Sequence, residues 1–244
     1  MKRAPGYSDV NREELSGIQH STWPKLLAGE IDRHFGGPAR ETIRILDIGA
    51  GPGFISIILT ELGYRVTAAD FAENMIAQAR ENAGDLADRI TFVQADAMHL
   101  SFTDASFDVV VSRNLTWNLP DPEQAYREWL RVLKPGGLML VFDANWYAFL
   151  VDEAQRAAYE NDRKQVAAQG YDDYNIGENF DVMDDIARHL PLTGVDRPAW
   201  DGAVLDRLGA TRVDLVEDIG STVYSDKEKV NYASTPMFLV RVVK

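Results

Sequence analysis

The chain of 244 residues contains no cysteine and only four histidines. The absence of cysteine excludes disulfides, thiolate metal sites and a cysteine nucleophile. Basic residues are also scarce, with 25 lysines and arginines against 38 aspartates and glutamates, so the net charge is −13. A nucleic-acid-binding surface needs an excess of positive charge, and an anionic membrane repels an acidic protein. We therefore expect neither nucleic acid nor membrane as a partner.

Long hydrophobic runs are missing as well. No stretch approaches the roughly 18 consecutive apolar residues of a membrane span, and residues 1–14 lack the apolar segment of a secretory signal. Hydrophobic residues make up 45% of the chain and charged residues 26%, which is typical of a soluble globular protein. These features favour a cytoplasmic enzyme or binding protein built as a single domain over residues 1–244.

Strand-like and helix-like segments alternate between residues 43 and 143. The predicted strands are 43–48, 64–69, 90–93, 107–112 and 138–142, and the predicted helices are 55–62, 73–82 and 121–133. Such alternation indicates a parallel sheet with helices on both faces. Residues 1–40 are expected to form a helical cap, and residues 145–198 a helical insertion. Residues 199–244 are expected to hold a final helix (200–208) and two strands (213–217 and 237–243), joined by a hairpin loop over 221–234.

A glycine-rich loop, Gly49-Ala50-Gly51-Pro52-Gly53, follows the first predicted strand. Glycines allow a sharp turn and let the backbone approach a ligand closely. The dinucleotide fingerprint needs glycine where Phe54 stands, and the lysine of a phosphate-binding loop is absent. Asp47, two residues before the first glycine, disfavours a pyrophosphate and favours an ammonium group. The loop therefore predicts a site for a nucleoside without phosphates.

Two further acids follow the second and third predicted strands. Asp70 is placed where a carboxylate can accept hydrogen bonds from both hydroxyls of a ribose, and Asp96 where it can accept one from an adenine amine. Either acid alone could serve as a helix cap or a loop acid. Because ligands of open parallel sheets bind beyond the carboxyl ends of the strands, acids at three successive strand ends indicate one shared site.

In these segments the chain resembles the class I S-adenosylmethionine-dependent methyltransferases. The resemblance rests on the order and spacing of five segments, which are residues 45–53, 69–71, 94–97, 107–112 and 132–137. It implies an α/β fold with three layers, in which a Rossmann-like sheet of seven mostly parallel strands has its last strand antiparallel. Residues 43–143 would be the cofactor-binding core and residues 145–198 a helical lid.

The resemblance also implies roles for individual residues. The loop and Asp47 would line the methionine and ribose of S-adenosylmethionine, Asp70 would bind the ribose hydroxyls, and Phe71 would cover the adenine. Asp96 and Ala97 would meet the adenine amine and edge, and residues 112–114 would pass beneath the sulfonium. The implied cofactor-binding residues are Asp47, Gly49, Ala50, Gly51, Gly53, Asp70, Phe71, Asp96, Ala97 and Arg113.

Candidate catalytic and substrate residues lie outside the glycine loop. The catalytic candidates are His20 in the N-terminal helix, His189 in the insertion, and Arg113 and Asn114 after the fourth strand. The substrate candidates follow the fourth and fifth strands and are Trp117, Asn118, Asn145, Trp146 and Tyr147. The alternative for these residues is a purely structural one, in which asparagines hold a loop and the aromatic rings pack the insertion.

The leading hypothesis is a methyltransferase that uses S-adenosylmethionine to methylate an oxygen or nitrogen nucleophile of a small molecule. Methylation of protein or RNA, and a non-catalytic module that binds S-adenosylmethionine, stay open as alternatives. A nicotinamide-dependent oxidoreductase is disfavoured because Phe54 breaks its glycine pattern. The spacing of histidines and acids predicts no metal site, although carboxylates brought together by folding could hold magnesium.

Overall fold

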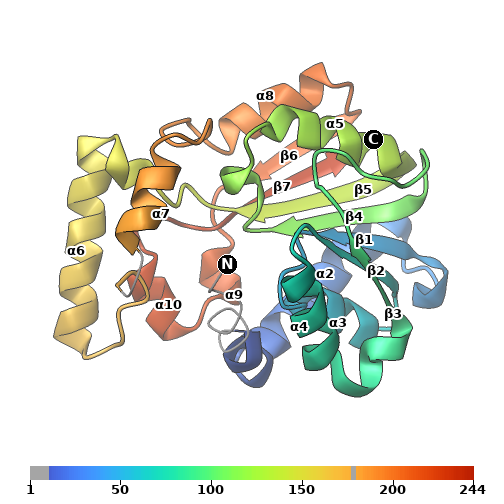
Figure 1. Cartoon of the computed structure of the whole chain (residues 1–244), viewed down its shortest axis with the longest axis horizontal. Coiled ribbons are helices and arrows are strands. Elements are labelled where there is room, and N and C mark those ends of the chain that lie inside the picture. The colour runs from blue at the N-terminus through green and yellow to red at the C-terminus, as the bar shows by residue number, and fades with distance from the viewer. Residues whose placement is uncertain (1–10, 177–179) are drawn as a thin grey trace.

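The fold is a seven-stranded sheet between two layers of helices (Figure 1). The computed structural model describes residues 11–176 and 180–244. In their order across the sheet, the strands are β3 (Ile90–Gln94), β2 (Arg65–Asp70), β1 (Arg44–Ile48), β4 (Phe107–Arg113), β5 (Leu133–Asp143), β7 (Phe238–Val243) and β6 (Arg212–Val216).

The sheet has the mixed topology that the sequence predicts. β1 pairs in parallel with β2 and β4, and β4 in parallel with β5, whereas β7 runs antiparallel between β5 and β6. Val109, Val110 and Val111 of β4 are all buried, as expected for a central parallel strand that is covered on both faces. The predicted antiparallel last strand is confirmed.

Each face of the sheet carries its own hydrophobic core. On one face pack α2 (Gln19–Phe35) and α3 (Phe54–Glu61), whose fully buried side chains include Trp23 and Ile58. On the other face pack α5 (Pro122–Val132) and α8 (Ala199–Arg207), with Trp129 buried between helix and sheet. Next to β2 and β3 lies α4 (Glu73–Ala83). Burying both faces leaves only the strand ends available to a ligand.

The start of α5 follows the local sequence closely. The Asp121 side chain accepts a hydrogen bond from the backbone N–H of Gln124, and Pro122 occupies the first turn, as the helix-start preferences predict. After this helix, β5 begins at Leu133, five residues earlier than expected. Leu133 pairs with Phe107 before a register shift, so the strand already begins before the Pro-Gly-Gly sequence that was expected to precede it.

The expected hairpin loop over residues 221–234 is wrong. The structure places two short helices in this region, α9 (Gly220–Val223) and α10 (Asp226–Asn231). Ser225 and Glu228 form a capping box at the start of α10, each side chain bonding the other residue's backbone N–H. The Ser-x-x-Glu spacing is a sequence signal for a helix start, and it was overlooked in favour of the hairpin connection.

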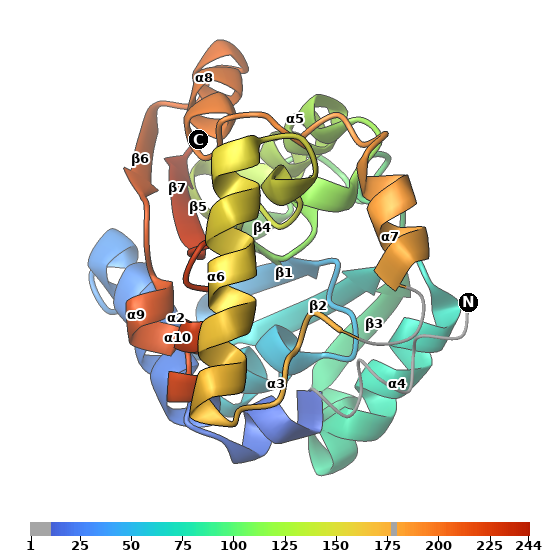
Figure 2. The same cartoon turned by 90° about the vertical axis from the view of Figure 1, so that its left-hand side faces the viewer.

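Further helices lie beyond the carboxyl ends of the strands. The insertion forms α6 (Glu153–Gln169) and α7 (Phe180–Ala187), and α6 passes in front of the sheet next to α10 (Figure 2). Short 3₁₀ helices complete the chain, namely η1 (Arg40–Thr42), η2 (Gly84–Arg89), η3 (Thr116–Asn118) and η4 (Ala148–Leu150). The edge of the sheet that carries the candidate site therefore faces α6, α7 and α10.

Candidate functional site

The glycine loop turns the chain from β1 into α3. Gly49, Gly51 and Gly53 have φ values of 69°, 53° and 98°, a region that side chains disfavour. A Cβ on Gly49 would lie 2.7 Å from the Leu115 side chain, and one on Gly53 would lie 3.1 Å from Cβ of Ala79. A Cβ on Gly51 would meet only a backbone oxygen at 4.0 Å. Packing therefore favours glycine at positions 49 and 53, whereas Gly51 leaves the backbone open towards a ligand.

Asp70 connects the end of β2 to this loop. Its Oδ2 accepts a hydrogen bond from the backbone N–H of Gly51 at 2.9 Å, and its Oδ1 accepts one from Ala72 at 2.9 Å. Each carboxylate oxygen can accept more than one hydrogen bond, so Asp70 keeps acceptor capacity for ligand hydroxyls. The next side chain, Phe71, is 71% exposed. An exposed aromatic ring beside a fixed carboxylate suits a base and a ribose.

Asp47 lies beneath the loop, where it is 1% exposed. Its Oδ2 accepts a hydrogen bond from the Ser56 hydroxyl at 2.6 Å. Burial raises the pKa of Asp47 to about 7, the Ser56 hydrogen bond opposes this rise, and the charge of Asp70 adds to it. Asp47, which the sequence predicts to face the ligand, is thus buried below the loop, with a pKa near neutral pH.

Asp96 and Ala97 follow β3. The Asp96 carboxylate accepts a hydrogen bond from the backbone N–H of Met98 at 2.9 Å and lies 3.3 Å from Nδ1 of His99. The carbonyl of Ala97 accepts the indole N–H of Trp129. The Asp96 side chain is 34% exposed, so it remains accessible at the strand end. The carbonyl of Ala97, in contrast, is engaged in a hydrogen bond within the core.

Arg113 is the last residue of β4, and Asn114 follows it. Arg113 forms an ion pair with Glu14 through both terminal nitrogens, and its guanidinium lies 4.8 Å from the Trp23 ring centroid and 4.9 Å from that of Phe54. The ion pair connects the N-terminal helical segment to the end of β4, beside the first residue of α3. Asn114 is exposed, with a φ of 56°, and Ser112 before Arg113 is 1% exposed.

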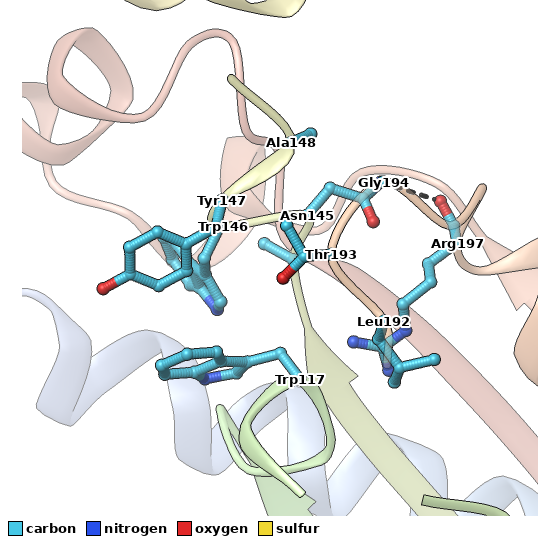
Figure 3. Close-up of a pocket in the computed structure, with 10 residues that line it drawn as sticks. Trp117, Asn145, Trp146, Tyr147, Ala148, Leu192, Thr193, Gly194 and Arg197 are labelled. Atoms are coloured by element: carbon cyan, nitrogen blue, oxygen red, sulfur yellow. Dashed lines mark hydrogen bonds between the residues drawn. The ribbon is translucent and has the colours of Figure 1, made fainter. Parts of the chain in front are cut away.

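A small pocket lies at the carboxyl ends of β4 and β5. In Figure 3 Trp117 lies on one side of it and Tyr147 and Trp146 on the other. The Trp117 and Tyr147 ring centroids are 5.1 Å apart. The complete lining is Trp117, Ala144, Asn145, Trp146, Tyr147, Ala148, Leu192, Thr193, Gly194 and Arg197. The structure thus brings four of the five predicted substrate residues together.

The remaining predicted residues lie elsewhere. His20 contacts Oε2 of Glu61 through Nε2 at 2.8 Å, and His189 is held by the backbone carbonyl of Asp185. Asn118 is exposed in η3. None of these three, nor Asn114, belongs to the pocket lining. No imidazole therefore faces the pocket.

Sequence reasoning overlooked several residues that build this pocket. Asp143 and Arg197 form a buried ion pair at 2.9 Å behind the pocket wall, and Leu192, Thr193 and Gly194 complete the lining. Asp143 could have been predicted as a site residue, because it is another acid at the end of a strand. The others lie in the insertion and before α8, and nothing in the local sequence marks them.

Comparisons with known proteins agree with this architecture. Residues 46–141 match the family described as "Methyltransferase domain", and this segment carries the glycine loop, Asp70 and Asp96. Over these residues the chain is similar to the class I S-adenosylmethionine-dependent methyltransferases.

Several curated relatives of this chain are named as methyltransferases of menaquinone or ubiquinone biosynthesis. The chain is 46% identical over 147 residues to a demethylmenaquinone methyltransferase of Clavibacter sepedonicus, covering 58% of this chain and 59% of the relative. It is 35% identical over 156 residues to a ubiquinone/menaquinone biosynthesis C-methyltransferase of Roseobacter denitrificans, covering 62% and 59%. The chain thus spans less than two thirds of the length of either relative.

A solved structure matches this chain along nearly all of its length. It is assigned to the S-adenosyl-L-methionine-dependent methyltransferases of Methanococcus maripaludis, with a TM-score of 0.60 and 24% identity, and it covers 99% of this chain and 93% of that one. At this identity the match supports the fold alone. It extends the likeness beyond the family segment to the helices that face the pocket.

The residues at the sheet edge fit the S-adenosylmethionine that the resemblance implies. The open backbone at Gly51, the fixed carboxylate of Asp70 and the exposed Phe71 ring could contact an uncharged adenosine, and the loop lacks a basic residue for phosphates. Over residues 11–176 and 180–244, no helix is long and apolar enough to cross a membrane. Over the same residues, no group of three or more histidines or carboxylates could hold a metal ion.

Proposed function

We propose that this protein transfers the methyl group of S-adenosylmethionine to an oxygen or nitrogen nucleophile of a small molecule. The observation that supports this most is the position of the pocket. It lies at the carboxyl ends of β4 and β5, and β1, which leads into the glycine loop, pairs directly with β4. Methyl transfer needs the nucleophile and the methyl carbon to be held in near-attack geometry, and adjacent sites on one sheet edge provide this.

The cofactor-binding part of the proposal assigns roles to this chain's own residues. Asp70 binds the ribose hydroxyls, Phe71 covers the adenine, Asp96 accepts from the adenine amine, and the open backbone at Gly51 lies against the ligand. When bound, S-adenosylmethionine supplies an electrophilic methyl group on a sulfonium. Asp47, beneath the loop, supplies negative charge for a cationic ligand once it is ionised.

The pocket lining favours a small planar acceptor. Three aromatic side chains, Trp117, Trp146 and Tyr147, line the pocket. Aromatic walls favour flat rings through offset and edge-to-face contacts. A protein segment or RNA would need an open groove, and the net charge of −13 disfavours RNA.

The lining also constrains the chemistry of the acceptor. Among the residues that the structure describes, the lining contains no histidine and no carboxylate, which are the side chains that most often act as general bases, a role that typically contributes 10²–10⁴-fold. An acceptor that is already nucleophilic avoids this need. We therefore propose a phenol-like or enol-like hydroxyl, or a neutral amine, instead of an aliphatic alcohol.

A carbon acceptor is the second candidate function. The relative from Roseobacter denitrificans is named a C-methyltransferase of quinone biosynthesis, and the Clavibacter sepedonicus relative is named for demethylmenaquinone. An electron-rich aromatic carbon is also a planar acceptor, so the same pocket would serve it. We further propose that α6 and α7 act as the lid of the site.

The experiment is an incubation of the protein with ¹³C-methyl-labelled S-adenosylmethionine and a fractionated metabolite extract. We expect a labelled small molecule, and the ¹³C chemical shift of the new methyl group distinguishes oxygen, nitrogen and carbon acceptors. Label found only in protein or RNA would overturn the small-molecule proposal. Binding of S-adenosylhomocysteine without any labelled product would favour a non-catalytic binding module.

A matched pair of probes tests the planar pocket without knowledge of the natural acceptor. Protein saturated with S-adenosylhomocysteine is titrated calorimetrically with 2-naphthol and with decahydro-2-naphthol, which has the same hydroxyl on a saturated, non-planar ring system. We expect measurable binding of 2-naphthol and at least tenfold weaker binding of the saturated compound. Equal affinities would show that the aromatic walls do not select planar molecules.

A further inference from the structure

Asp143 joins the two aromatic walls of the pocket. This side chain is 0% exposed at the carboxyl end of β5. Its Oδ2 accepts a hydrogen bond from the backbone N–H of Trp117 at 3.0 Å, and its Oδ1 accepts the indole N–H of Trp146 at 3.1 Å. The backbone N–H of Ala144 donates to the same Oδ1 at 2.9 Å. One carboxylate therefore holds both tryptophans in position.

Arg197 fixes the orientation of that carboxylate. Its Nη1 donates to Oδ2 of Asp143 at 2.9 Å, and its Nε and Nη2 donate to the two oxygens of Asp201 at 2.9 and 2.7 Å. The Tyr126 hydroxyl donates to Asp201 as well. The Arg197 guanidinium lies 4.9 Å from the Phe238 ring centroid. With every guanidinium nitrogen engaged, Arg197 has little freedom to turn.

Arg197 also contributes directly to the pocket. Its backbone carbonyl accepts a hydrogen bond from Nδ2 of Asn145 at 3.0 Å, and both residues line the cavity. The chain segments after β4, after β5 and before α8 thus meet at one buried ionic group. These segments are far apart in sequence, and the hydrogen bonds of this ionic group connect all three of them.

The chemistry of the group requires a carboxylate at position 143. All four of its partners are hydrogen-bond donors, and an ionised carboxylate is the side chain that only accepts. An asparagine would turn an NH₂ group towards a donor, so at least one of the four hydrogen bonds would be lost. Because charge-assisted hydrogen bonds are short and directional, their loss frees the Trp146 ring and the backbone at Trp117 to move.

We propose that Asp143 and Arg197 are positioning residues that hold Trp117 and Trp146 as the walls of the acceptor pocket. The inference rests on the proposed function in one respect, namely that this pocket receives the acceptor. Neither side chain needs to touch the acceptor or the methyl group. Their role is to fix the separation of the walls, so that a planar molecule enters without the cost of ordering the rings.

The first test is spectroscopic and needs no acceptor. The chain has five tryptophans, so a ¹⁵N correlation spectrum of labelled indoles gives five signals, which Trp→Phe variants assign. We expect Asp143→Asn and Arg197→Lys to displace or broaden the Trp146 signal. The Trp129 indole, which donates to the Ala97 carbonyl at 2.9 Å, is the internal control and should stay in place.

The second test measures binding of 2-naphthol to protein saturated with S-adenosylhomocysteine. We expect Asp143→Asn and Arg197→Lys to weaken the binding of 2-naphthol at least fivefold. The affinity for S-adenosylhomocysteine should change less than twofold. Trp146→Phe keeps an aromatic ring and the ionic group, removes the indole donor and replaces the indole with a smaller ring. It should weaken 2-naphthol by a smaller factor, and it tests the inference even if the charge-altering variants fail to fold.

The matched control is Glu30→Gln, which breaks another ion pair far from the pocket. Glu30 is 5% exposed and accepts from Arg241 at 2.6 and 2.8 Å. It should leave the Trp146 signal and 2-naphthol affinity unchanged. An unmoved Trp146 signal in the folded variants, or equal weakening by Glu30→Gln, would overturn the inference. If the wild-type protein does not bind 2-naphthol, the planar-acceptor proposal fails, and the indole signal still decides whether the walls are held.

Discussion

Replacing Asp47 with asparagine should stabilise the protein at neutral and alkaline pH. The side chain is 1% exposed and accepts one hydrogen bond, from Ser56 at 2.6 Å. Burial raises the pKa of Asp47 to about 7 from 3.8, because the charged form loses its hydration. Above that pH the folded protein must hold a buried negative charge, and an asparagine at this position removes it.

The magnitude follows from the difference in proton binding between the folded and unfolded states. The unfolded chain releases the Asp47 proton near pH 4 and the folded chain near pH 7, so the folded state binds more protons between these values. Stability therefore falls as the pH rises through this window, and it reaches a constant penalty above it. A shift of about 3 pKa units corresponds to about 4 kcal/mol.

The assay is urea denaturation of the wild-type protein and Asp47→Asn at several pH values from 5 to 8. Since part of the penalty is already present at pH 5, we expect the stability of the variant relative to wild type to increase by about 2.5 kcal/mol across this range. Other titrating groups contribute equally to both proteins and cancel. Ser56→Ala, which removes the hydroxyl donor, should extend the pH-dependent loss of stability to higher pH.

A relative stability that stays flat between pH 5 and 8, or that decreases, would refute this reasoning. It would mean that Asp47 titrates in the folded protein as it does in the unfolded chain. The same substitution should weaken the binding of S-adenosylmethionine at pH 8, because it removes the negative charge beneath the cationic ligand. Stability and ligand affinity are thus expected to change in opposite directions at this residue.

Three further substitutions have expected effects on the free energy of unfolding, each measured by chemical denaturation. Gly53→Ala should destabilise by about 1–3 kcal/mol, because φ is 98° and the new Cβ would lie 3.1 Å from that of Ala79; an unchanged midpoint would contradict the packing. Arg197→Met should cost about 3–5 kcal/mol, since it leaves two buried carboxylates without their cation; a loss below 1 kcal/mol would contradict this. Ser225→Ala should cost about 1 kcal/mol by removing the cap of α10, and no loss would mean that the capping box is not maintained in solution.

The position of the glycine loop and of its neighbouring acids could be predicted because their signals are local. The glycines of residues 49–53 and the acids Asp47, Asp70 and Asp96 lie at or just after the end of a recognisable strand, and the parallel topology alone brings strand ends together. Asp121 and Pro122 likewise marked the start of α5 correctly. In these places one short segment determines both the structure and the position of the side chain.

The acceptor pocket could be predicted only in part. The aromatic residues after β4 and β5 were found because they also follow strands, but Arg197 reaches Asp143 from 54 residues away in sequence. Such a contact depends on how the insertion folds back, which no local pattern encodes. His20 and His189 were predicted because the N-terminal helix and the insertion cover the site in the family that the chain resembles, but contacts in the folded chain give both side chains partners outside the pocket. Knowing which segment covers a site does not determine where its side chains point.

The most direct test is a crystal structure of the protein with S-adenosylhomocysteine. The account predicts that both ribose hydroxyls lie within hydrogen-bond distance of the Asp70 carboxylate, that the adenine contacts the Phe71 ring, and that the sulfur points towards the pocket between Trp117 and Trp146. A complex with the nucleoside bound away from residues 49–53, or with the sulfur directed away from that pocket, would contradict it.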